Sequence, residues 1–158
     1  DADGAVVQVA DGRNPSSEMQ LHLACYRAFD DIGSVIHSHP VWATMFAVAH
    51  QPIPAAVDEF AVYCGGEIRC ADYAASGTPD VGHNAVKALE GRAAALIANH
   101  GLVAVAPRPD KALHVTALVE RMAQIVWGAR TLGGPAPIPD GVNKNFASVY
   151  PYLRQNPM

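Results

Sequence analysis

Positive charge is scarce in this sequence of 158 residues, which has 11 lysines and arginines against 15 aspartates and glutamates. The formal net charge is −4, and the basic residues form no cluster, so the sequence lacks the basic surface typical of nucleic-acid-binding proteins. Although 50% of the residues are hydrophobic, no apolar run approaches the roughly 20 residues that span a bilayer. We therefore expect a globular protein that binds neither nucleic acid nor membrane.

Cysteine is equally rare. Cys25, Cys64 and Cys70 are odd in number and lack C-x-x-C spacing, which makes a disulfide framework or a thiolate metal site the less favoured interpretation. Residues 1–13 are acidic and rich in turn-forming residues, unlike a secretory signal peptide. These features predict reduced thiols and a cytoplasmic protein.

The sequence alternates between strand-like and helix-like segments. Strands are expected over residues 4–10, 34–39, 93–101 and 102–106, and helices over residues 16–33, 40–50, 78–91 and 108–134. One or two further short strands are expected within residues 53–75, and a short helix after the proline-rich residues 134–141. This mixture predicts one α/β domain over residues 1–158, with helices on both faces of a sheet.

Two histidines close the predicted strand in SVIHSHPVWATMFAV, residues 34–48. Residues two apart in a strand point to the same face, so His37 and His39 form a pair of nitrogen ligands. His100 is the best third candidate, because it ends an apolar strand and precedes Gly101, which allows close backbone approach. Three protein ligands are typical of a catalytic zinc site. The alternative is a chance pair of histidines satisfied by hydrogen bonds.

Glu18, Ser16 and Ser17 precede the first predicted helix. Taken alone, Glu18 is best explained as an acid that complements the helix dipole, and the serines as helix caps. The functional alternative is a carboxylate that transfers a proton, beside hydroxyls and amides that bind a phosphate.

Three segments resemble, in order, the class II aldolase/adducin family, and most closely its L-fuculose-1-phosphate aldolases. They are PSSEMQLHLACYRAFDDIGSVIHSHPVWAT, then IPA followed by CGGEIRCADYAASGT, and finally ALIANHGLVAV. The resemblance implies a three-layer αβα fold with a mixed or antiparallel central sheet. It also implies a homotetramer with active sites at subunit interfaces.

The resemblance further implies a zinc-dependent aldolase. The zinc is expected to be held by His37, His39 and His100, with Glu18 as a further ligand and the catalytic acid/base. Ser16 and Ser17 would bind the phosphate of a ketose 1-phosphate such as L-fuculose 1-phosphate. Cleavage between C3 and C4 would give dihydroxyacetone phosphate and an aldehyde such as L-lactaldehyde, through an enediolate stabilised by the metal. Other divalent metals remain open, because imidazole suits several of them.

The sequence departs from the family pattern in two places. It lacks the family's N-terminal segment, including a Gly-Asn-x-Ser motif that completes the phosphate site. Asp58 and Glu59 stand where the aldolases have a tyrosine that reaches the neighbouring subunit's site. Tyr150 or Tyr152 matches a C-terminal tyrosine that covers the site in the family. We therefore expect these four residues at the interface part of the site.

Other branches of the family offer alternative functions. Ribulose-5-phosphate 4-epimerases usually have aspartate at the position of Glu18 and an acidic residue near position 62, where this sequence has Val62. Both differences favour an aldolase, while a metal-dependent dehydratase of the same family stays open. A non-catalytic adducin-like interaction domain is disfavoured, because such domains typically lose the ligand histidines that this sequence keeps.

Overall fold

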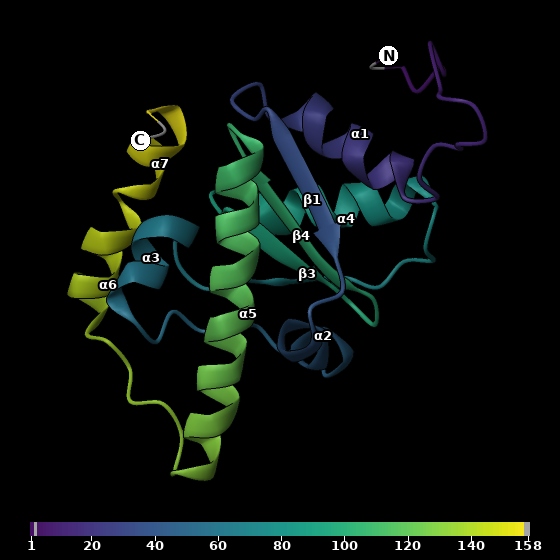
Figure 1. Ribbon diagram of the computed structural model, residues 1–158. Coiled ribbons are helices and arrows are strands. Elements are labelled where there is room, and N and C mark those ends of the chain that lie inside the picture. The colour runs from purple at the N-terminus through teal and green to yellow at the C-terminus, as the bar shows by residue number, and fades with distance from the viewer. Residues whose placement is uncertain (2, 157–158) are drawn as a thin grey trace.

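The structure, a computed structural model, describes residues 1 and 3–156. Within these residues, a four-stranded sheet lies at the centre of the molecule (Figure 1). Its strands stand in the order β1 (Ser34–Ser38), β4 (Gly101–Ala106), β3 (Ala94–Ile97) and β2 (Cys70–Ala71). β4 is antiparallel to both of its neighbours, whereas β2 is parallel to β3. The expected mixed sheet is confirmed.

Helices cover both faces of this sheet (Figure 1). They are α1 (Met19–Ala28), α2 (Val41–Val48), α3 (Asp58–Cys64), α4 (Pro79–Leu89), α5 (Pro109–Thr131), α6 (Asp140–Ala147) and α7 (Tyr150–Gln155). α1 and α4 pack on one face, α2, α3 and α5 on the other, and α6 and α7 pack against α3. The three-layer αβα prediction is confirmed. Among the described helices, including the 23-residue α5, none has the length and apolar character needed to cross a bilayer.

The two central strands are buried on both sides, which explains their almost continuous apolar sequence. Successive residues of β3 alternate between the two cores. Leu96 packs with α2, α3 and α5, whereas Ile97 packs with α1 and α4. Val35 of β1 belongs to the α1–α4 side, so His37, two residues further, projects from the same face.

Residues 4–10 do not form the predicted strand. Valines alternate with other residues in this segment, as in a strand. However, no strand pairing among the described residues includes it, and Val7 is 78% exposed. A strand needs a partner for its backbone hydrogen bonds, and none of the described strands pairs with this segment. The alternating pattern of residues 4–10 is therefore not sufficient to form a strand without a neighbouring strand.

The short strands predicted within residues 53–75 are partly replaced by a helix. β2 is present, and Ile53 forms an isolated bridge with Ile68. Residues 58–64 are α3 instead, because Phe60, Ala61 and Cys64 occupy one helical face that enters the core. The helix ends at Gly65, whose φ of 78° suits a glycine.

Glu120 of α5 holds the N-terminus of α2, directly after the histidine pair. Its Oε1 accepts a hydrogen bond from the amide of Trp42 at 2.9 Å, and its Oε2 accepts one from Ala43 at 2.8 Å. Pro40, the residue before α2, makes no side-chain cap. A carboxylate at this place satisfies two free amides and complements the helix dipole.

Glu120→Ala is expected to lower the free energy of unfolding by about 1–3 kcal/mol, because two partly buried amides lose a charged partner. The measurement is urea unfolding followed by circular dichroism. Glu90→Ala, which removes an exposed carboxylate at the end of α4, is the matched control and should change stability by less than about 0.5 kcal/mol. Equal effects of the two substitutions would contradict the capping role.

The three cysteines are free thiols in different environments. Burial raises the pKa of Cys25 to about 12 and also raises the pKa of Cys64. Cys70 is half-buried, and burial followed by the charge of Asp72 raises its pKa. Since the thiolate is the reactive form, a raised pKa reduces the reactive fraction near neutral pH.

We expect a thiol reagent such as Ellman's reagent at pH 8 to modify Cys70 first. Cys25 and Cys64 should react only after the protein is unfolded in guanidinium, because both are inaccessible and protonated in the folded state. Peptide mapping after alkylation identifies the order. Equal rates of modification at all three cysteines in the native protein would contradict the burial of Cys25 and Cys64.

Candidate metal centre

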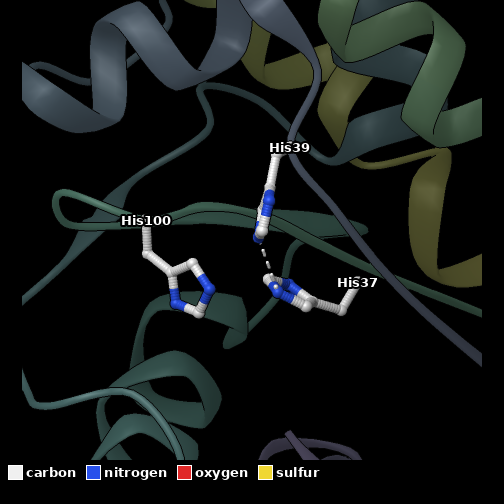
Figure 2. A group of neighbouring side chains, drawn as sticks. All are labelled: His37, His39 and His100. Atoms are coloured by element: carbon white, nitrogen blue, oxygen red, sulfur yellow. Dashed lines mark hydrogen bonds between the residues drawn. The ribbon is translucent and has the colours of Figure 1, made fainter. Parts of the chain in front are cut away.

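Three histidines converge where β1 ends and where β3 turns into β4 (Figure 2). His37 lies in β1, His39 follows it, and His100 lies in the turn between β3 and β4. The ring centroids are 4.7–4.9 Å apart, and one ligand nitrogen of each residue lies within 4.8 Å of the others. The structure thus brings together the three residues singled out from the sequence.

The close approach of β1 and β4 depends on Gly101. A Cβ at this position would lie 2.6 Å from the carbonyl oxygen of Ser38 and 2.6 Å from Cδ2 of His39. Both distances are far below van der Waals contact. Asn99, two residues earlier, adopts the left-handed conformation with φ of 54°, which asparagine tolerates in tight turns. The Asn-His-Gly sequence therefore fits the turn that presents His100.

The ring orientations suit a metal ion. Nδ1 of His37 donates a hydrogen bond to the carbonyl oxygen of Leu102 at 3.0 Å, which leaves the lone pair of Nε2 free. Nε2 of His37 and Nε2 of His39 face each other at 3.1 Å. Two nitrogens on one tetrahedral zinc, with bonds of about 2.0–2.1 Å, lie roughly 3.4 Å apart. The donor set fits zinc and, as imidazoles, other divalent transition metals.

The electrostatics favour the ligand form of His37. Its pKa is lowered, chiefly by burial. The hydrogen bond to Leu102 and the negative charge of Glu18 oppose this shift, and the neighbouring His100 and His39 reinforce it. A lowered pKa keeps the imidazole neutral near pH 7, and only the neutral ring binds a metal.

Glu18 immediately precedes α1 and is buried, with 6% of its surface exposed. Its negative charge acts to raise the pKa of His37, but the carboxylate is not part of the group of three histidines. Oε1 accepts a hydrogen bond from the hydroxyl of Ser76, whereas Oε2 is buried and has no hydrogen-bond partner among the described residues. This burial differs from the solvent-exposed acid that usually stands at a helix N-terminus.

Ser16 and Ser17 are exposed beside this carboxylate. The Oγ of Ser16 accepts a hydrogen bond from the amide of Glu18 at 3.1 Å, as a capping side chain does. The carbonyl oxygen of Ser17 lies 3.4 Å from the place of a Cβ at Gly77. The N-terminal end of α1 therefore contacts the loop between β2 and α4. Ser76 in this loop was missed, and its only signal was its place within the ADYAASGT segment.

Within one chain, the other four predicted site residues do not join the histidines. Asp58 and Glu59 are exposed in the first turn of α3. Tyr150 is buried on α7, where its hydroxyl accepts a hydrogen bond from Arg154 at 3.2 Å, and Tyr152 is 65% exposed. Figure 1 shows α3 and α7 on the far side of α5 from α1. A role for these residues at a subunit interface stays a prediction.

The sequence matches the profile of the Class II Aldolase and Adducin N-terminal domain over residues 1–127. Because this match covers most of the chain, the chain belongs to this family.

Curated relatives are named as aldolases. The chain is 35% identical over 128 residues to L-fuculose phosphate aldolase of Escherichia coli O6:H1, covering 81% of this chain and 60% of that protein. It is 34% identical over 148 residues to 5-deoxy-D-ribulose 1-phosphate aldolase of Bacillus thuringiensis, covering 94% of this chain and 68% of that protein.

A solved structure of an aldolase has the same fold. An L-fuculose 1-phosphate aldolase superimposes with a TM-score of 0.84 at 38% identity, covering 90% of this chain and 67% of that one. The chain thus spans about 60% to two thirds of the length of these relatives.

Proposed function

We propose that this chain carries the catalytic centre of a metal-dependent aldolase that cleaves a ketose 1-phosphate to dihydroxyacetone phosphate and an aldehyde. The observation that carries the proposal is the convergence of three imidazole nitrogens next to a buried carboxylate. The names of the relatives support the substrate class, since L-fuculose phosphate and 5-deoxy-D-ribulose 1-phosphate are both ketose phosphates with a methyl end.

In this proposal His37, His39 and His100 hold a zinc ion. When bound, the ion supplies Lewis-acid stabilisation of the negative charge that develops on the substrate when C3 and C4 separate. Three protein nitrogens are typical of a catalytic zinc site, and in this proposal Glu18 serves as a further ligand at the remaining position. A lysine that forms a Schiff base is not required for this chemistry.

The remaining residues bind the substrate and move its protons. We assign the phosphate to the hydroxyls of Ser16 and Ser17, which lie at the amide-rich start of α1. During cleavage the electron pair of the C3–C4 bond forms the C2–C3 double bond of the enediolate. Glu18 then returns a proton to C3. In the condensing direction Glu18 removes this proton, and the buried, unpartnered Oε2 is the oxygen suited to hold it.

The proton of the C4 hydroxyl needs a second acceptor. We assign this role to the acidic pair Asp58 and Glu59, which lie away from the histidines and would act across a subunit interface. Tyr150 and Tyr152 lie nearby on α7, and we place them at the same interface. The proposed assembly is a homotetramer in the cytoplasm. Light scattering after size-exclusion chromatography tests the tetramer, and a monomer with full activity would exclude a shared site.

The activity is tested with the zinc-loaded chain and two substrates, L-fuculose 1-phosphate and 5-deoxy-D-ribulose 1-phosphate. Release of dihydroxyacetone phosphate is followed by coupled reduction with NADH. We expect release that a chelator abolishes, that zinc restores, and that Glu18→Gln lowers by at least about a hundredfold. Glu90→Gln, at an exposed carboxylate, is the control. No release from either substrate by a zinc-filled protein would reject the aldolase in favour of an epimerase or a dehydratase.

A further inference from the structure

The C-terminal end of α2 has a histidine where a glycine is usual. The amide of His50 donates to the carbonyl oxygen of Ala47 at 3.2 Å. The amide of Gln51 donates to the carbonyl oxygen of Phe46 at 3.0 Å. These two bonds form a Schellman motif, in which the residue at the position of His50 is left-handed and usually glycine. His50 has φ of 51°, so this chain keeps a bulky side chain where glycine would fit without strain.

The side chain of His50 is bonded to a second residue of the same unusual conformation. Its Nε2 donates a hydrogen bond to Oδ1 of Asn99 at 2.5 Å. Asn99 has φ of 54°, and among the described residues these two are the only non-glycine residues with positive φ. Their backbones meet as well, because the amide of Asn99 also donates to the carbonyl oxygen of Ala47, at 3.1 Å. Strained backbone of this kind is frequent at functional sites, where the surrounding structure enforces it.

α2 thereby connects the two parts of the histidine cluster. The helix begins two residues after His39, and its C-terminal end is bonded to the residue directly before His100. Figure 1 shows α2 below the end of β1, next to the turn between β3 and β4. His50 itself is outside the group of three possible ligands. Its ring therefore acts on the cluster only through the turn that carries His100.

We propose that His50 and Asn99 are positioning residues that hold His100 in place against the other two histidines of the cluster. The hydrogen bond between their side chains fixes the turn between β3 and β4 against the end of α2, so the ligand is in position before an ion binds. This inference rests on the proposed metal centre, and it adds two residues that do not touch the metal. Its physical basis is that a ligand already held in place loses less conformational freedom on binding.

The test is a titration of the metal-free chain with Co²⁺, whose visible absorption reports the number and geometry of its ligands. His50→Gly keeps the left-handed backbone but removes the ring, and Asn99→Gly does the same for the amide side chain. Each variant should bind Co²⁺ about tenfold more weakly and change the spectrum, because the turn that carries His100 is no longer held. The double variant should bind no more weakly than either single variant, since both substitutions remove the same hydrogen bond.

The stability of the metal-free variants separates this role from a general structural one. Glycine relieves the left-handed strain at both positions, which offsets the lost hydrogen bond, so the urea midpoints should stay close to that of the wild type. A purely structural role would instead lower the midpoint and leave the cobalt spectrum of the folded protein unchanged. His83→Ala, at an exposed histidine of α4, is the control and should change neither affinity nor spectrum.

Two results would overturn the inference while leaving the metal centre intact. One is wild-type cobalt affinity and spectrum in His50→Gly. The other is an additive loss of affinity in the double variant, which would show that the two side chains act independently. Failure of the wild-type chain to bind Co²⁺ would instead reject the metal centre, and the inference with it.

Discussion

His37→Ala is expected to remove zinc binding and to lower the proposed aldolase activity by about three orders of magnitude. His37 offers one nitrogen of the cluster, 3.1 Å from that of His39, and its ring is oriented by the carbonyl oxygen of Leu102. Without it only two imidazoles remain, too few for a stable catalytic site. The loss corresponds to several kcal/mol of charge stabilisation in the transition state.

Zinc content after dialysis and the rate of dihydroxyacetone phosphate release are the two measurements. His83→Ala is the matched control, because His83 is exposed on α4, where its Nδ1 lies 3.9 Å from a carboxylate oxygen of Asp80. This variant should keep both zinc and activity. A His37→Ala protein that retains stoichiometric zinc and wild-type turnover would refute the assignment of the metal centre.

Gly101→Ala is expected to damage both the fold and the metal centre. The added methyl group would lie 2.6 Å from the backbone oxygen of Ser38 and from the ring of His39, so the end of β1 must move. Such overpacking costs about 1–3 kcal/mol of unfolding free energy. Because the displaced atoms belong to a ligand and to its neighbour, zinc affinity should fall by about tenfold or more.

The comparison for this variant is Gly128→Ala in α5. Apart from the adjacent residues and the backbone of the same helix, no atom of the described residues lies within 4 Å of the Cβ position there. Alanine in a helix is favoured over glycine by up to about 1 kcal/mol. Unfolding midpoints and zinc competition with a chromogenic chelator give the two quantities. If Gly101→Ala matched Gly128→Ala in both, the close approach between β1 and β4 would not be required.

Much of the sheet and the histidine cluster could be predicted from local patterns. The apolar runs of β3 and β4 are long enough to indicate buried strands, and the two-residue spacing places His37 and His39 on one face. His100 was identified by its position at a strand end. The pairing of β1 with β4 then places it close to His37 and His39. These signals survive in a single sequence because each depends on only a few neighbouring residues.

The errors arose where a partner outside the segment decides the structure. Residues 4–10 have the alternation of a strand but lack an adjacent strand, whereas Phe60, Val62 and Tyr63 favour a strand by propensity and yet lie in a helix. Ser76 could not be predicted to hold Glu18, because a serine in a loop has no periodicity and its partner is 58 residues away.

The pairing of β1 with β4 also dictates when the metal centre can form. The hydrogen bond from His37 to Leu102 joins residues that are 65 positions apart in the sequence. His100 lies near the Leu102 end of this stretch. Closing so long a loop is an entropic cost that slows folding. During synthesis, no ion can be captured by all three imidazoles before β4 has left the ribosome and paired. Metal loading therefore follows folding, and bound zinc should mainly slow unfolding and leave the rate of folding unchanged.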